Sequence, residues 1–440
     1  MKRYLVVFAL FVLSLITYID RVCISSAKEP MTADLVLTDQ QMGAVFSAFA
    51  LGYAIAQVPS GWFADRYGPR FALAAVVVLW SLFTAGTGLV QNSGVLWAVR
   101  FLFGIGEAGA FPGSARAIVN WLPAQERGRA NGILFSGSRI GAALAFPLFA
   151  WLIPQFGWRQ AFFLFGAIGI AWAIAWYVFF RNHPADHNGA LATSRANAPQ
   201  GAFTEKERLA TRARQDAGPP PADLNDVSFG QVFRSRVMLL TMVQYFASNF
   251  TFFICLSWML PFLQNRFELM PAEAAAYAMI PLLCGATSQW VAGFVVDLLY
   301  RSGWRAMSRR LPGMMGFGLS VAGLAALTQA STAALAVACF ALATFGTDMT
   351  ISPSWAYCMD IGGRNAGSVS GSMNMIGNFG SFVSANAFPW LLGLTGSANA
   401  YFVVAALLNL AAVACWLGMR PPSQAEKLER KLCPESASST

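Results

Sequence analysis

The chain is built from apolar stretches of about 20 residues, which recur from one end to the other and are separated by short polar segments. A helix rises about 1.5 Å per residue, so a stretch of that length spans the roughly 30 Å hydrocarbon core of a bilayer. Charged residues make up 12% of the chain, against about 25% in soluble proteins, which predicts an all-α integral membrane protein. Twelve transmembrane helices are expected, near residues 4–27, 41–63, 71–90, 94–118, 130–153, 158–180, 237–262, 273–297, 311–330, 332–358, 367–393 and 397–419.

Basic residues lie mainly on one side of this predicted array. Lys2 and Arg3 precede the first stretch, and further basic residues occupy the segment 181–236 and the tail 420–440. The positive-inside rule places this side in the cytoplasm, so both termini are expected there. The net charge of +9 therefore indicates membrane topology rather than a nucleic-acid partner. The first stretch is too long for a signal peptide and lacks a small-residue cleavage site, so we expect a retained helix.

The polar, proline-rich segment 181–236 divides the chain into two predicted bundles, 1–180 and 237–419. We expect it to be a cytoplasmic linker loop, and 420–440 to be a cytoplasmic tail. Short motifs recur in the two halves at nearly constant offset: Gly61-x-x-x-Asp65 with Gly293-x-x-x-Asp297, Arg129-Ala-Asn-Gly with Arg364-Asn-Ala-Gly, and Ala161-Phe162 with Ala400-Tyr401. A duplicated six-helix unit is predicted, with a substrate site between the halves near the midplane.

Several motifs give these bundles a family resemblance. The segment "GWFADRYGPR" (Gly61–Arg70) resembles the signature between the second and third helices of the major facilitator superfamily. Within that superfamily, "TYIDR" in the first stretch, "RFLFGIGEAGAFPG" in the fourth and "GSMNMIGNFGSF" in the eleventh resemble the anion:cation symporters. The resemblance implies the major facilitator fold, with two pseudo-symmetric six-helix bundles. It also implies a carrier of organic anions such as sugar acids and aromatic carboxylates, typically taken up with protons.

Four charged residues lie at membrane depth in the first and fourth stretches. Asp20 and Arg21 lie about 16 residues, or roughly 24 Å, along the first stretch from its cytoplasmic end. Arg100 lies about six residues, or roughly 9 Å, into the fourth stretch from its outer end, and Glu107 lies two turns further on the same helix face. Ionisable residues inside a membrane are costly and indicate function by default. The alternative is a pair of structural salt bridges.

An arginine offers a planar donor fork that suits a substrate carboxylate. An acid that loses its arginine to the substrate is left buried without a counter-ion, which favours proton binding when the anion arrives. The resemblance implies that Asp20 and Glu107 are protonation sites, and that Arg21 and Arg100 are binding or coupling residues. We favour Arg21 as the substrate-facing cation, and which acid carries the coupled proton stays open.

Polar and aromatic side chains in other stretches are expected to complete the cavity by hydrogen bonding or by stacking on an apolar substrate body. Helix packing or interfacial anchoring would explain each of them individually as well. Asn374 and Asn378 share a helix face at i, i+4 spacing, which favours them a little. The candidates are Tyr18, Tyr53, Gln244, Tyr245, Asn249, Ser352, Trp355, Asn374 and Asn378, those of the tenth and eleventh stretches being placed by the family pattern.

Asp348 in the tenth stretch and Arg139 in the fifth are ionisable residues for which the resemblance supplies no role. A pair between the two, a place for Asp348 along the inner path, and a third titrating group are the open interpretations. A substrate with two carboxylates would be one consequence of the additional cation.

The signature segment is expected to perform a different task. Gly61 permits close packing, and an acid such as Asp65 is favoured beside the N-terminus of a neighbouring helix. The resemblance implies a latch between the halves on the cytoplasmic side, made by Gly61, Asp65, Arg66, Gly68 and Arg70, that stabilises the outward-open state. Membrane topology alone would explain Arg66 and Arg70 but not Asp65.

These features together predict an inner-membrane secondary transporter that imports an organic carboxylate with protons by alternating access and acts as a monomer. No GxxxxGK[ST] motif occurs, so an ion gradient or exchange is expected to drive it. The nearest alternative is a proton-independent exchanger of organic or phosphorylated anions, because paired arginines also suit phosphate. A transporter-like sensor or a membrane enzyme is disfavoured. The cysteines lack C-x-x-C spacing and His183 and His187 suit a solvated loop, so no metal or cofactor is expected.

Overall fold

The computed structural model describes residues 2–184 and 229–419, and this part of the chain consists of helices joined by short turns. Most of the predicted linker, with His187, and the whole predicted tail 420–440 lie outside the described residues. The first half contains α1 (Lys2–Ser26), α2 (Lys28–Asp34), α3 (Asp39–Tyr67), α4 (Pro69–Thr87), α5 (Ser93–Glu107), α6 (Ala110–Trp121), α7 (Arg127–Phe156) and α8 (Trp158–Phe179). The second half contains α11 (Phe229–Phe233), α12 (Arg236–Ser257), α13 (Met259–Phe267), α14 (Pro271–Arg301), α15 (Arg305–Leu327), α16 (Ala333–Met349), α17 (Ile351–Gly362), α18 (Ala366–Thr395) and α19 (Asn399–Gly418).

Side-chain caps and glycines set the ends of several helices. The side chains of Asn92 and Thr332 accept hydrogen bonds of 2.9 and 3.3 Å from backbone N–H groups in the first turns of α5 and α16. Gly68 and Gly157 adopt φ angles of 80° and 81°, which side chains disfavour. These two glycines allow the sharp corners between α3 and α4 and between α7 and α8.

Two of the predicted membrane helices are broken near their middle. The fourth is divided into α5 and α6, and the tenth into α16 and α17. Pro112 and Pro353 lie in the first turn of the second segment in each case. A proline has no N–H, so the carbonyl four residues earlier loses its helical donor and the helix is interrupted. The breaks therefore occupy equivalent positions in the two halves.

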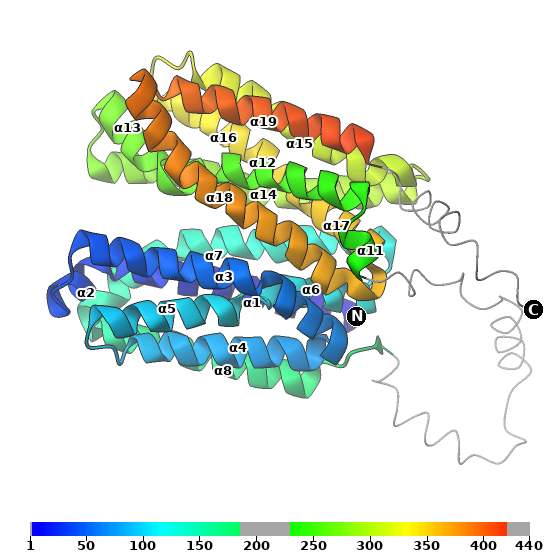
Figure 1. The fold of residues 1–440 in the computed structure, drawn as a ribbon, viewed down its shortest axis with the longest axis horizontal. Coiled ribbons are helices and arrows are strands. Elements are labelled where there is room, and N and C mark those ends of the chain that lie inside the picture. Colours follow the sequence, from blue (N-terminus) through cyan, green and yellow to red (C-terminus); the bar gives the residue numbers. More distant parts are fainter. Residues whose placement is uncertain (1, 185–228, 420–440) are drawn as a thin grey trace, which may run out of the picture.

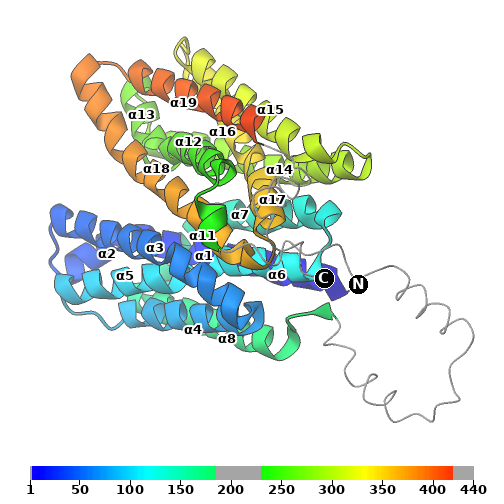
Figure 2. The same cartoon turned by 45° about the vertical axis from the view of Figure 1, so that its right-hand side comes forward.

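The two halves meet along two pairs of helices (Figure 1). α3 packs against α18, and α7 packs against α14. Small residues permit the close approach, since Gly61 faces the backbone of Gly367 and Gly132 faces the backbone of Gln289. The halves are in contact at the end where α1 begins and α8 ends, called the linker end below. Figure 2 shows α3 and α18 diverging from there toward the opposite end, which carries α2 and α13.

Among the described residues, 11 helical segments are long and apolar enough to cross a membrane. One of them, from Ala333 to Thr395, is 63 residues long and contains both the broken helix α16–α17 and α18. It therefore accounts for two crossings, which gives the twelve that the sequence predicts. Large apolar side chains such as Leu82, Trp151 and Phe382 are exposed on the outside, as expected of a surface that contacts lipid. The predicted all-α fold of two six-helix bundles is confirmed.

Candidate functional site

Arg21 of α1 and Glu107 at the end of α5 form an ion pair inside the first half. Arg21 Nε donates to Glu107 Oε1. The Glu107 side chain is fully buried, whereas the Arg21 side chain keeps 18% of its surface exposed. The Arg21 Cζ lies 4.5, 4.9 and 5.2 Å from the ring centroids of Tyr53, Tyr18 and Phe49. Arg21 is therefore a caged cation that retains partial access.

Asp20 and Arg100 are buried in the same half. Trp80 Nε1 donates to Asp20 Oδ2 at 3.2 Å, and Asp20 is buried. The guanidinium of Arg100 lies over the rings of Phe103 and Phe49, with Cζ 4.3 and 5.3 Å from their centroids. Within the described part of the chain, Arg100 Nε and Asp20 Oδ1 have no hydrogen-bond partner. The set Asp20, Arg21, Arg100 and Glu107 is called the charge cluster below.

Five aromatic side chains, called the aromatic bridge below, connect the two halves beside the charge cluster. The Tyr18 ring meets Phe111 edge to face at 6.5 Å, and Phe111 stacks on Phe135 at 5.0 Å. The Phe135 ring lies 4.9 Å from Trp355 of the second half. Trp355 Nε1 then donates to the Tyr245 hydroxyl at 2.9 Å. Tyr18, Tyr245 and Trp355 were expected at the site, whereas Phe111 and Phe135 look like ordinary apolar residues in the sequence.

Asn374 of α18 reaches the first half. Its Nδ2 lies 3.3 Å from the Tyr53 hydroxyl and 3.1 Å from Gln57 Oε1. Asn378 instead donates to the backbone carbonyl of Asn374 at 2.7 Å, so its side chain lies along its own helix. Of these two predicted residues, Asn374 contacts the aromatic cage of Arg21 through Tyr53.

The remaining predicted residues of the second half are engaged in protein hydrogen bonds. Gln244 is fully buried and accepts from the Ser354 hydroxyl at 3.2 Å. Asn249 donates to a backbone carbonyl of its own helix at 3.0 Å. The Ser352 hydroxyl donates to the Gly128 carbonyl of the first half at 2.6 Å. In this conformation Ser352 joins the halves, so substrate contact by this hydroxyl requires another state.

Arg139 of α7 and Asp348 of α16 form an ion pair between the halves. Arg139 donates from Nε to Asp348 Oδ2 at 2.8 Å and from Nη2 to Oδ1 at 2.6 Å. Both side chains are buried, with 5% and 0% exposure. The ring of Phe252 covers the guanidinium, with its centroid 3.7 Å from Cζ. Of the open interpretations of these two residues, the structure bears out the pairing.

Two carboxylates join the halves at the linker end, and these contacts are called the paired latches. Asp65 at the end of α3 accepts from the backbone N–H groups of Gly367 and Ser368 at 2.9 and 2.7 Å, and from the Ser368 hydroxyl at 2.7 Å. Asp297 near the end of α14 accepts from two backbone N–H groups at the start of α7, at 2.9 and 3.1 Å. Each carboxylate thus binds the positive N-terminal end of a helix in the other half.

The five predicted latch residues divide into two groups. Gly61 and Asp65 contact the second half, at Gly367 and beyond. Gly68 shapes the corner after α3, and Arg66 is exposed. Arg70 Nε donates to a backbone carbonyl of α8 at 2.9 Å, within its own half. The contact between the halves is therefore made by the first part of the signature segment.

Sequence reasoning missed a third contact at the linker end. Asp360 of α17 accepts from Arg127 Nη1 at 2.7 Å and from Arg309 Nε at 3.1 Å. Arg309 Nη2 also donates to the Ala124 carbonyl of the first half at 2.8 Å. Asp360 follows the tenth predicted helix, where an acid among basic residues is typical of an ordinary loop.

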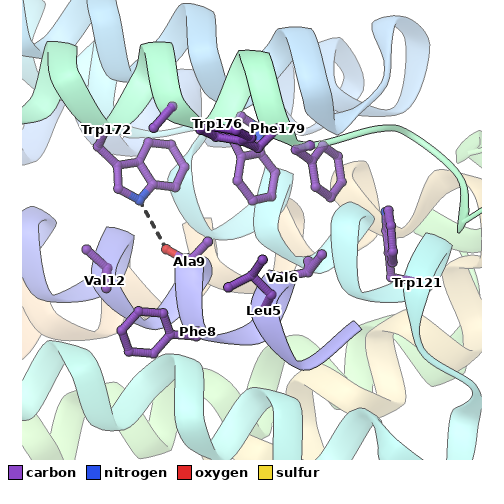
Figure 3. A pocket seen from close by; sticks show the side chains of 11 residues that line it. Leu5, Val6, Phe8, Ala9, Val12, Trp121, Trp172, Trp176 and Phe179 are labelled. Atoms are coloured by element: carbon purple, nitrogen blue, oxygen red, sulfur yellow. Dashed lines mark hydrogen bonds between the residues drawn. The ribbon is translucent and has the colours of Figure 1, made fainter. Parts of the chain in front are cut away.

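An apolar pocket of about 430 Å³ opens between α1 and α8 near the linker end (Figure 3). Its lining includes Val6, Trp121, Trp172 and Trp176, and Trp172 Nε1 donates to the Ala9 carbonyl at 3.2 Å. No charged side chain lines it among the described residues. This pocket suits an apolar occupant and lies apart from the charge cluster.

Comparison with known proteins agrees with this geometry. The model of the Major Facilitator Superfamily matches residues 10–385. The probable sulfoacetate transporter SauU of Cupriavidus necator is 31% identical over 414 residues, which cover 94% of this chain and 93% of that protein. The probable L-galactonate transporter of Escherichia coli is 32% identical over 385 residues, 87% of this chain and 81% of that protein. The probable galactarate/D-glucarate transporter GudP of Escherichia coli is 29% identical and covers 94% of this chain and 92% of that protein.

Solved structures share the fold. The proton:xylose symporter XylE superposes with a TM-score of 0.73 at 17% identity and covers 97% of this chain and 98% of its own. The human organic anion transporter MFSD10 gives a TM-score of 0.71 at 16% identity, covering 94% of this chain and 100% of its own. The chain therefore belongs to the Major Facilitator Superfamily, as a multi-pass membrane transporter rather than an enzyme, and its relatives are organic-anion transporters.

Proposed function

We propose that this protein imports an organic acid across a bacterial inner membrane together with protons, by alternating access. The observation that carries the proposal is the Arg21–Glu107 pair, in which a partly accessible cation is bound to a fully buried acid. The relatives named for sulfoacetate, L-galactonate and galactarate/D-glucarate support an acid as the substrate.

Coupling follows from exchange of one carboxylate for another at Arg21. A substrate carboxylate that takes the guanidinium leaves Glu107 in a buried site without its counter-ion, and a bound proton then removes the cost of that charge. Thermodynamic linkage makes the effect reciprocal, so that the proton and the anion favour each other's binding. Asp20, held by Trp80 beside Arg100, is the second candidate proton carrier.

The linker end corresponds to the cytoplasmic side, because the basic residues of the chain concentrate there. The paired latches and Asp360 hold the halves together at this end. We therefore interpret the described conformation as outward-facing. Release of the substrate into the cell then requires Asp65 and Asp297 to leave the N-terminal ends of α18 and α7, and Asp360 to release Arg127.

Uptake into proteoliposomes tests the proposal. With the purified transporter and an imposed inward proton gradient, labelled galactonate, galactarate or sulfoacetate should accumulate above the outside concentration, and a protonophore should abolish the accumulation. Accumulation that ignores the proton gradient but needs an internal anion would favour the proton-independent exchanger instead. If none of these acids enters, the proposed substrate class is wrong.

A further inference from the structure

Asp348 in the second half holds the position that Glu107 holds in the first. Glu107 is the last residue of α5, and Asp348 is next to the last of α16. The proline that interrupts each helix lies five positions after the acid: Pro112 after Glu107, and Pro353 after Asp348. Each is fully buried and bound by an arginine of another helix. The two halves therefore present the same device, a buried acid with an arginine partner at a broken helix, and broken helices mark binding sites in transporters.

The arginine partner of Asp348 lies at the aromatic bridge. Arg139 follows Phe135 by one turn of α7, on the side away from the linker end. On either side of Arg139, Gly137 and Gly141 of α7 pack against the α1 backbone at Phe11 and Leu15. The Arg21 guanidinium lies over the Tyr18 ring, which is itself part of the aromatic bridge, so both cations lie beside this bridge.

The Asp348 carboxylate binds the Arg139 guanidinium in the geometry that an acid group of a substrate would adopt. Its two oxygens meet Nε and Nη2 side by side, which is the fork geometry that arginine offers to any carboxylate. A buried guanidinium needs such a counter-ion when the site is empty. Gly285 of α14 makes room for it, because a Cβ at this position would overlap the Asp348 carboxylate.

We propose that Arg139 is a second anion site and that the substrate is a small diacid, with one acid group on Arg21 and the other on Arg139 in place of Asp348. The second group is a carboxylate or a sulfonate, since both offer oxygens to the same fork. This inference rests on the proposed function, in which Arg21 binds the first acid group, and it adds the number of acid groups that the site accepts.

Matched ligands test the inference by isothermal titration of the purified protein. Galactarate and galactonate differ by one carboxylate, and sulfoacetate and acetate differ by the sulfonate. The wild type should bind the diacid of each pair at least about tenfold more tightly than the monoacid, as expected for a second charge-assisted fork. Equal affinities within both pairs would contradict the inference. If none of the four acids binds, both the inference and the proposed substrate class fail.

Two variants separate a ligand site from a structural bridge. Asp348→Asn removes the resident carboxylate, so diacid affinity should rise about threefold or more while monoacid affinity stays within about twofold. The double variant Arg139→Gln/Asp348→Asn removes both charges, so the diacid preference should fall to within about twofold while monoacids still bind. A merely structural pair would leave the ratio of diacid to monoacid affinity unchanged in both variants. If monoacids are taken up and this ratio is unchanged, the diacid inference is wrong while the proposed function stands.

Asp360→Asn is the matched control. Asp360 is also an acid held by arginines between the halves, but it lies at the linker end, away from the aromatic bridge. Its loss should change the two affinities of a pair by the same factor. A changed diacid preference in this control would show that any break between the halves alters selectivity, which would contradict the assignment to Arg139.

Discussion

Arg21 is placed to exchange one carboxylate for another without leaving its cage. The rings of Tyr18, Phe49 and Tyr53 hold the guanidinium while part of its surface stays accessible. Glu107 has no exposure, and its Oε2 has no hydrogen-bond partner in the described part of the chain. Arg21 is thus the main compensation for the Glu107 charge, which makes the acid sensitive to what the arginine binds.

Glu107→Gln should separate exchange from accumulation. The amide keeps the shape of the side chain and a hydrogen-bond acceptor for Arg21, but it carries no titrating proton. Counterflow exchange of labelled substrate should stay within about threefold of wild type, while accumulation driven by a proton gradient should drop at least about tenfold. Glu29→Gln, at an exposed acid in α2, should change neither. Normal accumulation by Glu107→Gln would refute its role in coupling.

Arg21→Lys should weaken substrate binding although the charge is kept. An ammonium is a point charge and cannot reproduce the planar fork or the stacking over three rings. We expect the dissociation constant, measured by titration, to rise at least about tenfold, which corresponds to one charge-assisted hydrogen bond. Arg266→Lys, at an exposed position in α13, serves as the control. Wild-type affinity in Arg21→Lys would rule out recognition by the fork.

The charge cluster could be predicted from the sequence because each of its members is expensive inside a membrane and therefore stands out. Phe49 and Trp80 could not be predicted. An aromatic residue in an apolar stretch looks the same whether it packs against lipid, another helix or a guanidinium. Only the fold shows that Phe49 lies between Arg21 and Arg100 and that Trp80 donates to Asp20.

Among the elements, the N-terminal ends of α18 and α7 decide how firmly the linker end is closed. A carboxylate at a helix N-terminus contributes about 1 kcal/mol. The double variant Asp65→Asn/Asp297→Asn should therefore shift the balance toward the inward-facing state by roughly tenfold or more. Spin labels at the exposed positions Arg66 and Ser302, one in each half, should report a longer distance by double electron–electron resonance.

A control variant at the opposite end of the molecule tests whether the label distance depends on the latch carboxylates. Asp34→Asn alters an exposed acid in α2, at the other end of the molecule, and should leave the label distance unchanged. An unchanged distance in the double latch variant would mean that Asp360 and the helix packing close the linker end without the two carboxylates.

The broken helices and the short helices α2 and α13 were not predicted. Glycine and proline are frequent in membrane helices, so the composition of "GEAGAFPG" and "DMTISPS" does not predict a helix break. The available signal was their likeness, an acid five positions before a proline in both halves. The helices α2 and α13 contain charged residues and lie at the end opposite the linker, where hydropathy gives no sign of helix.

At the scale of the whole molecule, the fold repeats one bundle twice and joins the copies through the same kinds of contact. Asp65, predicted as a latch residue, and Asp297, predicted only as a recurring motif position, make equivalent contacts to α18 and α7. The sequence repeat was sufficient to predict the two bundles. It was insufficient to predict which side chains cross between them, because crossing contacts depend on the tilt of the halves, which no local pattern encodes.

Proton entry measured directly tests the central claim most sharply. Proteoliposomes that contain a pH-sensitive dye and no imposed gradient should acidify inside when an external organic acid anion is added to the wild type. The acidification should be lost in Glu107→Gln while labelled exchange persists. Anion entry without acidification in the wild type, or equal acidification in Glu107→Gln, would contradict proton coupling through the Arg21–Glu107 pair.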